Sequence, residues 1–437
     1  MSNTELLKNC RNCSSKDLKE VFSLGEIYPS NFVSAPFYYM QHEEKLPLEL
    51  VECQDCGLTQ LKHTVDLDSM YRQYWYQSGL NASMKSDLKD IVESVENKIF
   101  VSEDDLVVDI GCNDGTLFTF YSNQFGKPFK VGFDPAYNLA ESAEENCDLF
   151  INDYFSGDLL LARTNGKKAT VITSIAMFYD LPDPNNFIRE VKKVLDYDGI
   201  WVIQFTDLYS MFKINAFDNI CHEHLEYYKL SDVVTILNNN GLNVFDVEYN
   251  KVNGGSVRIY VRGDYDGFHL PIEVSVSDAL EKEAEYFNSE EGSWEAFSER
   301  YEKNKSDLLS LLYFFHNNLI NVAGLGASTK GNTLLQAYDL SWKYIDVIGE
   351  INRDKFGLVT IGSHIPIQDE SRIFNGDVYK HFIILPWHFR TSFLNNARIQ
   401  EILSNGGALI FPLPEVTVVT KDGEYSCLQY MKSLLGS

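Results

Sequence analysis

Apolar residues in the middle of the chain form short runs that alternate with amphipathic segments. The runs lie at 106–110, 130–133, 148–151, 169–174, 199–205, 243–249 and 256–261. This alternation predicts parallel strands joined by helices, and the last two runs predict an added strand pair. Ahead of the series, apolar residues recur at helical spacing from Met84 to Val95, which predicts a helix over 82–98.

A second, shorter series of apolar runs lies at 319–323, 344–349, 381–385 and 407–411. It repeats the order of strand, glycine turn and helix, so we expect a second, smaller doubly wound domain. Between the two series, the stretch from 270 to 310 holds eleven acidic and four basic residues. The helical spacing of its apolar residues predicts an acidic pair of surface helices that bridges the two domains.

The first glycine turn, Gly111-Cys112-Asn113-Asp114-Gly115, follows a predicted strand and opens a helix at 117–121. Its glycines are four residues apart, so it is not the dinucleotide fingerprint GxGxxG. Asp109 precedes the turn, and Asp153 follows the third strand. Asp134 ends the second strand, where an acidic residue commonly binds ribose hydroxyls. The pattern is typical of motif I of the S-adenosylmethionine (SAM) methyltransferases, and a purely structural turn is the alternative.

The second glycine turn, from Gly324 to Asn332, combines glycines with Ser328, Thr329 and Lys330 at a helix start. Backbone N–H groups, hydroxyls and one cation in such a turn suit a pyrophosphate. The order GxxxxGK[ST] is absent, so we expect nucleotide binding without ATP hydrolysis. The alternative is again a structural turn.

A third candidate segment, 217–228, contains His222-Glu223-His224. The two histidines are two residues apart rather than four, so this is not the HExxH zinc helix. A histidine beside a glutamate supplies a general base near neutral pH and a group that orients it. The alternative is a structural histidine cluster, with more weight for His222 than for His224.

Four of the eight cysteines form two CxxC pairs, Cys10/Cys13 and Cys53/Cys56, separated by 39 residues. This spacing predicts a closed site in which four thiolates bind a structural Zn²⁺ ion. Between the pairs the chain is rich in proline and aromatic residues, and we expect irregular backbone there.

The net charge of −26 disfavours a nucleic-acid partner, because binding to nucleic acid depends on phosphate neutralisation. The sequence shows no apolar run of membrane-spanning length and no signal peptide at its start, so we expect no membrane partner and a cytoplasmic location. We further expect a monomer or a weak homodimer.

Taken together, these motifs resemble the nucleotide-sugar C-methyltransferases, which place a methyl group on C-3 of a 4-keto deoxysugar. The resemblance covers nearly the whole chain. It rests on the four cysteines and on these segments: 74–79 (YWYQSG), 109–115, 222–224, 326–333 (GASTKGNT) and 385–389 (LPWHF). It implies an α/β protein with a zinc-binding domain, a doubly wound SAM domain and a Rossmann-like domain that binds the nucleotide sugar. We place these at 1–66, 67–264 and 319–437, with an acidic helical linker at 265–318.

The resemblance also implies roles for individual residues. His224 would be the base, Glu223 its orienting group and Tyr76 a hydrogen-bond donor to an enolate, with His222 beside them. SAM would be bound by Asp109, Gly111, Asn113, Gly115, Asp134, Asp153 and Ser78. The nucleotide sugar would be bound by Ser328, Thr329, Lys330, Asn332 and Glu350, and Zn²⁺ by Cys10, Cys13, Cys53 and Cys56.

Two positions depart from the family pattern. Cys221 stands where the characterised sugar enzymes carry a tyrosine, and Phe178 stands near the place of a histidine that follows the fourth strand. Because both departures are expected at the active site, the methylated position and the sugar stay open. An O- or N-methyltransferase of a related glycan precursor, or a non-catalytic ligand-binding protein, are the alternatives.

Overall fold

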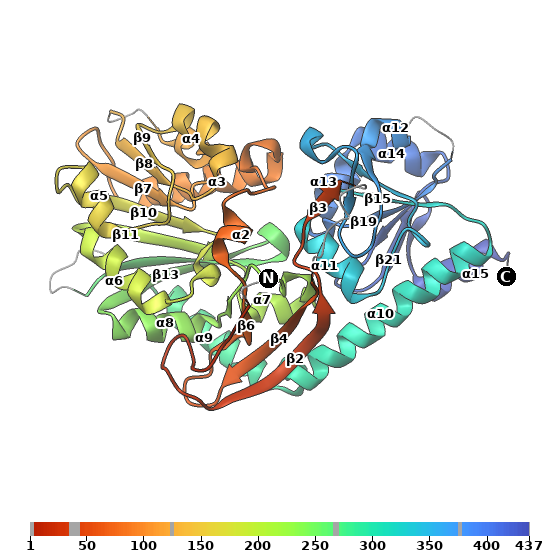
Figure 1. Ribbon diagram of the computed structural model, residues 1–437, viewed down its shortest axis with the longest axis horizontal. Coiled ribbons are helices and arrows are strands. Elements are labelled where there is room, and N and C mark those ends of the chain that lie inside the picture. Colours follow the sequence, from red (N-terminus) through yellow and green to blue (C-terminus); the bar gives the residue numbers. More distant parts are fainter. Residues whose placement is uncertain (1–3, 35–43, 123–125, 265–270, 375–377, 437) are drawn as a thin grey trace. The chain divides into compact units, whose positions relative to one another are not determined.

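The computed structural model describes residues 4–34, 44–122, 126–264, 271–374 and 378–436 (Figure 1). The chain divides into two compact units. The first comprises Met1–Glu20, Val51–Ser210 and Glu223–Phe287, and the second comprises Val21–Leu50, Met211–His222 and Asn288–Ser437. Neither unit is continuous in the sequence.

The first unit contains a seven-stranded sheet of order β13-β14-β11-β10-β7-β8-β9. Its strands are β7 (Leu106–Ile110), β8 (Phe129–Phe133), β9 (Leu149–Ile151), β10 (Ala169–Ile175), β11 (Leu195–Phe205), β13 (Leu242–Asn250) and β14 (Ser256–Gly263). The pairs among β7 to β11 are parallel, whereas β14 is antiparallel to both of its neighbours. The predicted strands and the doubly wound fold are confirmed, and the parallel strands run in the order third, second, first, fourth, fifth.

Helices cover both faces of this sheet (Figure 1). Val107 and Val171 pack with α3 (Ala82–Lys98) on one face, and Val108 and Ile172 pack in a second cluster on the other. This division follows because successive side chains of a strand point to opposite faces. The other helices are α4 (Ala140–Asn146), α5 (Gly157–Arg163), α6 (Pro184–Val194), α8 (Leu230–Asn239) and α9 (Val274–Phe287). The short helix predicted at 117–121 is a 3₁₀ turn, η2 (Thr116–Phe120).

The cysteine-rich region is not irregular, and that prediction was wrong. It contains β1 (Glu5–Leu6), β2 (Leu18–Ile27), β3 (Phe32–Ser34), β4 (Leu46–Cys53), β5 (Thr59–Leu61) and β6 (His63–Thr64). β2, β4, β5 and β12 (Glu226–Tyr227) form a four-stranded sheet of order β12-β5-β4-β2. Alternate burial along β4 explains why this stretch is extended. Residues 35–43 lie outside the described residues.

The second unit contains a sheet of order β18-β16-β15-β19-β20-β21-β22. The strands are β15 (Val322–Leu325), β16 (Val347–Glu350), β18 (Ile367–Asp369), β19 (His381–Ile384), β20 (Ala408–Phe411), β21 (Thr417–Thr420) and β22 (Gly423–Ser426). The first five in sequence pair in parallel and follow the same order as in the first unit. A Rossmann-like second domain is therefore confirmed. The antiparallel hairpin β21–β22 and the short pair of β3 with β17 (Leu358–Thr360) are additions to it.

The acidic stretch forms the two predicted helices, α9 in the first unit and α10 (Trp294–Asn317) in the second. Residues 265–270, at the start of the predicted linker, are outside the described residues. The other main helices of the second unit are α11 (Thr329–Ala337), α12 (Glu370–Phe374), α14 (Ala397–Ser404) and α15 (Cys427–Leu434). Among the described helices, none has the length and apolar character needed to cross a bilayer.

Candidate active site

The four cysteines of the two CxxC pairs come together in the first unit. Their Sγ atoms lie within 4.8 Å of one another, with 3.6 Å between Cys10 and Cys56 and 3.5 Å between Cys13 and Cys53. A tetrahedral Zn–thiolate centre with Zn–S bonds near 2.3 Å requires S–S separations of about 3.8 Å. The sulfur positions therefore fit Zn²⁺, which would hold the two knuckles together and leave no position for substrate.

Both knuckles are closed by tight turns. In the second, the Gly57 N–H donates to the Cys53 carbonyl oxygen at 2.8 Å, and Gly57 has φ +81°, a conformation that glycine adopts without strain. Cys10, Cys53 and Leu58 belong to the same hydrophobic cluster as the sheet residues Ile172 and Trp201. The zinc ligands are thus packed against the core of the seven-stranded sheet.

The first glycine turn lies at the carboxyl ends of β7 and β8. Gly111 (φ +74°) and Gly115 (φ +73°) let the backbone reverse twice within five residues. The Asn113 N–H donates to the Asp134 carboxylate at 2.8 Å, so the acid that ends β8 also fixes the turn. The Asp134 carboxylate accepts a second N–H from Ala136 at 2.9 Å, which leaves acceptor capacity for a ligand hydroxyl.

Three aspartates give this turn an acidic surrounding. Burial raises the pKa of Asp109 to about 7 and the pKa of Asp134 to about 6. The Asp109 carboxylate accepts a 2.6 Å hydrogen bond from the Thr173 hydroxyl, and Asp114 lies in the turn itself. Carboxylates that can accept hydrogen bonds from hydroxyl groups suit a ligand that combines a ribose with a positive charge, as SAM does. Asp153 lies farther out, where it is exposed and paired with Arg72 at 3.3 Å.

The same turn holds the tyrosine-rich segment. The Asn113 side chain donates to the Tyr76 carbonyl oxygen at 3.0 Å and accepts the Ser78 N–H at 2.9 Å, and the Asp114 carboxylate accepts the Gly79 N–H at 2.7 Å. A Cβ atom at position 79 would lie 2.8 Å from the Asp114 carboxylate, so the close approach requires glycine there. The candidate SAM loop therefore positions Tyr76 and Ser78. Asp114 was not among the predicted site residues.

His224 lies beside the segment that follows β10. Its imidazole ring packs on the Tyr179 ring, with 4.2 Å between ring centroids. The Tyr71 hydroxyl donates to the Glu223 carbonyl oxygen at 2.8 Å, and the Leu225 N–H donates to the Tyr179 carbonyl oxygen at 2.8 Å. The backbone on both sides of His224 is thus fixed by hydrogen bonds within the first unit.

Buried carboxyl groups surround the same segment. Burial raises the pKa of Asp180 well above its usual range, and the nearby Glu223 and Glu226 raise it further. Burial likewise raises the pKa of Glu226, while the Arg11 guanidinium opposes that effect. Asp180 and Arg11 were missed at the sequence level, because no local pattern places either next to His224.

Phe178 does not lie at the active site, and that prediction was wrong. Its side chain is fully buried in an aromatic cluster with Trp201 at 5.7 Å and Tyr228 at 5.2 Å between ring centroids. Its neighbour Tyr179 is the residue that contacts His224.

In the second unit, His222 is buried, and its Nε2 lies 3.4 Å from the Leu46 carbonyl oxygen.

The second glycine turn leads into the N-terminus of α11. The Ser328 hydroxyl caps the helix by accepting the Gly331 N–H at 2.9 Å. Asn332 is fully buried and donates to the Asn31 carbonyl oxygen at 3.1 Å, while its Oδ1 has no hydrogen-bond partner among the described residues. The Thr329 carbonyl oxygen accepts from the Ser30 hydroxyl at 3.0 Å. The helix start is therefore built with help from Ser30 and Asn31, which carried no signal in the sequence.

Lys330 occupies the first turn of α11, where the helix dipole disfavours a cation. Burial raises the pKa of the nearby Asp218 to about 6, an effect that Lys330 opposes. Trp387 donates to the Asp218 carboxylate at 2.7 Å. Burial and the Lys330 charge lower the pKa of His388 well below its usual range. The Lys330 charge and the N–H groups at the helix N-terminus together suit a phosphate group.

Glu350, which ends β16, is occupied by the backbone. Its carboxylate accepts N–H groups from Ala327 at 2.8 Å, Ile351 at 2.7 Å and Asn352 at 2.9 Å. A carboxylate has about four acceptor positions, so little capacity remains for a ribose hydroxyl. Glu350 therefore holds the glycine turn against β16.

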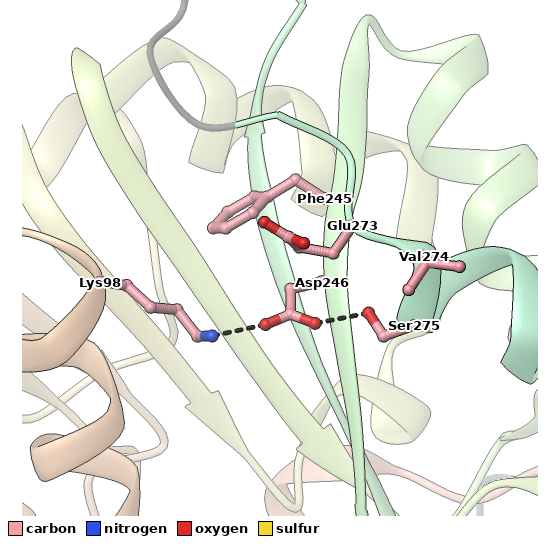
Figure 2. Close-up of a pocket in the computed structure, with 6 residues that line it drawn as sticks. All are labelled: Lys98, Phe245, Asp246, Glu273, Val274 and Ser275. Atoms are coloured by element: carbon pink, nitrogen blue, oxygen red, sulfur yellow. Dashed lines mark hydrogen bonds and ion pairs between the residues drawn. The ribbon is translucent and has the colours of Figure 1, made fainter.

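A pocket of 340 Å³ elsewhere in the first unit contains none of these residues. It lies along β13 and the start of α9 (Figure 2). Figure 2 shows Asp246 between Lys98 and Ser275, with its carboxylate bonded to both. The pocket residues are Lys98, Phe245, Asp246, Glu273, Val274 and Ser275. Asp246 thus joins Lys98 of α3 to Ser275 of α9.

Known proteins resemble both the whole chain and parts of it. A curated relative, the C-methyltransferase NovU of Streptomyces niveus, is 28% identical over 421 residues, which cover 95% of this chain and 98% of the relative. The magnesium protoporphyrin IX methyltransferase ChlM from Synechocystis PCC 6803, solved with bound SAM, is 17% identical over 41% of this chain and 79% of its own, with a TM-score of 0.30. A SAM-dependent methyltransferase from Aquifex aeolicus is 17% identical over 40% of this chain and 97% of its own, with a TM-score of 0.29.

Three family models match successive parts of the chain. A zinc-binding domain matches residues 10–71, a methyltransferase domain matches 81–247, and a C-methyltransferase C-terminal domain matches 251–414. The first match contains the four clustered cysteines, and the second contains the glycine turn with its three aspartates. The protein binds SAM and Zn²⁺. It is a SAM-dependent methyltransferase with a zinc-binding domain, a methyltransferase domain and a C-methyltransferase C-terminal domain in that order.

Proposed function

We propose that the protein transfers a methyl group to a carbon beside the ketone of a nucleotide-linked deoxysugar, through an enolate. The observation that carries this proposal is the placement of His224, whose backbone is fixed on both sides and whose ring packs 4.2 Å from Tyr179. A carbon atom accepts a methyl group only as a carbanion equivalent, so C-methylation requires a base to remove a proton. An adjacent ketone makes that proton acidic enough for an imidazole to remove.

In this mechanism His224 accepts the proton from the carbon beside the ketone, and Glu223 orients the imidazole. SAM supplies an electrophilic methyl group on sulfur, which the enolate carbon takes as the S–C bond breaks. The proton stays on His224 until solvent removes it.

Tyr76 donates a hydrogen bond to the enolate oxygen as negative charge develops there. Tyr76 is 37% exposed, yet desolvation of its hydroxyl and the nearby Asp114 raise its pKa above the usual range, so the phenol is protonated near neutral pH. Because Asn113 and Asp114 hold residues 76–79, the turn assigned to SAM also fixes this donor. Asp134 binds the ribose of SAM, and Asp109, Gly111, Gly115, Ser78 and Asp153 shape or line its site.

Lys330 and the N–H groups at the start of α11 bind the diphosphate of the nucleotide sugar. Ser328, Thr329, Asn332 and Glu350 shape that helix start and its turn. A diphosphate is attracted both by the Lys330 charge and by the N–H groups of this helix start.

The proposal is tested by hydrogen exchange without methyl transfer. The protein is incubated in D₂O with a nucleotide-linked 4-keto-6-deoxysugar and no SAM, and deuterium at the carbon beside the ketone is measured by NMR. We expect exchange above the uncatalysed rate, and His224→Asn should slow it by a factor of about 10² to 10⁴.

The exposed His316 offers a matched control, because His316→Asn makes the same chemical change on α10. This variant should exchange at the wild-type rate. Saturating substrate binding without enzyme-dependent exchange would rule out the enolate mechanism.

A further inference from the structure

Arg11 is the residue inside the first zinc knuckle, directly after the ligand Cys10. Only 3% of its side chain is exposed, and the side chain of Glu226, its ionic partner, is not exposed at all. The Arg11 Nε atom lies 3.5 Å from the Glu226 carboxylate. A guanidinium this deeply buried has lost its hydration, so its hydrogen bonds must fix it in one place.

The Arg11 guanidinium reaches three further acceptors. It donates to the Leu61 carbonyl oxygen at 3.0 Å, to the Leu225 carbonyl oxygen at 3.4 Å and to the Thr64 hydroxyl at 2.7 Å. Leu61 and Thr64 belong to the strands that follow the second knuckle, whereas Leu225 is the residue after His224. One side chain therefore joins the zinc-binding region to the segment that carries the proposed base.

Backbone hydrogen bonds make a second connection between the same two segments. β12 pairs with β5 through Glu226 and Gln60, and the Leu61 N–H donates to the Leu225 carbonyl oxygen at 2.8 Å. The buried Gln60 side chain accepts the Arg11 N–H at 3.0 Å and donates to the Cys10 Sγ at 3.2 Å. A displacement of the first knuckle would therefore move both the Arg11 side chain and Gln60 of β5, which connect the knuckle to the segment after His224.

We propose that Arg11, with Glu226 as its counter-charge, is a positioning residue that transmits the fold of the zinc-loaded knuckle to the backbone of His224. This inference rests on the proposed role of His224 as the base. The zinc-binding region then contributes to catalysis although its closed metal site cannot bind substrate. A zinc ion with four thiolates carries a net negative charge, which also favours a guanidinium beside it.

The test uses the full-length, zinc-loaded protein and three variants: Arg11→Lys, Arg11→Met, and the double variant Arg11→Met with Glu226→Gln. For each, zinc content, kcat, the KM for SAM and the pH profile of substrate hydrogen exchange are measured. The double variant is included because removing Arg11 alone leaves an unpaired buried acid, which could unfold the protein.

We expect all folded variants to retain zinc and the wild-type KM for SAM. In the double variant kcat should fall about 10- to 100-fold, the range typical of residues that orient a catalytic or metal-binding side chain. The exchange reaction should lose rate by the same factor, and the pH at which it reaches half its maximum should move, because the surroundings of His224 change. Arg11→Lys should lose less, since lysine keeps the charge without the planar fork.

Arg258→Lys serves as the matched control, because Arg258 is equally buried and pairs with Asp87 and Asp90 on α3. It should lower stability and leave the pH profile of exchange unchanged. The inference is overturned if the folded double variant keeps wild-type kcat and an unmoved pH profile while His224→Asn still abolishes exchange. If His224→Asn also exchanges normally, the proposed function itself fails.

Discussion

The two α/β units have the same order of parallel strands. They differ in the charge around the glycine turn that follows the first parallel strand of each sheet. In each, the acid that ends the second strand accepts an N–H from that turn, Asn113 to Asp134 and Ala327 to Glu350, both at 2.8 Å. The turn in the first unit is surrounded by Asp109, Asp114 and Asp134, whereas the turn in the second leads into a helix that carries Lys330.

Topology therefore determines where a ligand binds, and local charge determines which ligand binds there. In doubly wound sheets, ligands bind at the carboxyl ends of the strands where the strand order reverses, and both turns lie there. Carboxylates suit the sulfonium and ribose of SAM, and a helix N-terminus with a lysine suits a diphosphate. The two turns also lead into different elements, a 3₁₀ turn in the first unit and α11 in the second.

The largest expected effect concerns the cost of the acidic turn to stability. Asp109 has a pKa raised to about 7 by burial, so the folded protein keeps its proton at a pH where the unfolded chain has lost it. The contribution of Asp109 to the free energy of unfolding therefore falls as pH rises from about 4 to about 7, by at most about 4 kcal/mol. Asp109→Asn should remove this cost and be more stable than wild type at pH 7.5.

The measurement is thermal unfolding of the SAM-free protein and the variant between pH 5 and 8. The gap in unfolding temperature should widen as the pH rises from 5 to about 7 and then level off. A constant gap would show that Asp109 titrates normally and that the turn is not costly.

The next effect concerns Lys330. Lys330→Met should weaken binding of a nucleoside diphosphate about 100-fold, because charge-assisted hydrogen bonds contribute roughly 1.5–3 kcal/mol. SAM affinity should not change. Calorimetric titration with each ligand checks both expectations, and Lys343→Met, which alters another lysine of the second unit, is the control. Equal losses for both ligands would show that the two turns do not have separate ligands.

A smaller effect is expected in the first unit. Asp134→Asn should lower SAM affinity about 10-fold, since an amide keeps one acceptor and loses the charge. The wild-type protein should also bind SAM more weakly as pH falls below about 6, the pKa of Asp134, because its carboxylate becomes protonated. Titration of SAM at pH 5.5 and 7.5 checks this, and the variant should show a weaker pH dependence than wild type.

The smallest effect is expected at Glu350. Glu350→Gln should change the KM for the nucleotide sugar by less than about threefold, because an amide oxygen can still accept some of the three N–H groups. Steady-state kinetics measures it. A tenfold or larger increase in KM would mean that Glu350 binds substrate directly, as its position at the end of the second strand first indicated.

Most strands of both sheets could be predicted from the sequence, because apolar runs such as 106–110 and 381–385 bury both faces of parallel strands. β2 and β4 were missed although Leu46, Leu48 and Leu50 alternate with Pro47 and Glu49, which is a usable strand signal. The hairpin of β21 and β22 carried a usable signal, Asp422-Gly423 after a β-branched run, that was not recognised. The domain boundaries at 66, 264 and 318 stay predictions.

The clustering of the four cysteines and the position of the two glycine turns after strands could be predicted from the sequence, and the roles assigned to the turn residues stay predictions. Contacts between distant segments could not be predicted. Asp114 binds Gly79, and Arg11 reaches Leu225, only because the fold brings these segments together. The error at Phe178 has a related cause, since adjacent residues of a turn point in different directions: Phe178 packs on Trp201, whereas Tyr179 packs on His224.

The most direct test of the account is the position of the transferred methyl group. The protein is incubated with SAM carrying a deuterated methyl group and a panel of nucleotide-linked 4-keto-6-deoxysugars, and the products are mapped by mass spectrometry. The account predicts a labelled methyl group on a ring carbon beside the ketone, stable to mild hydrolysis. A label on oxygen or nitrogen, or no product from any sugar while SAM is bound, would contradict it.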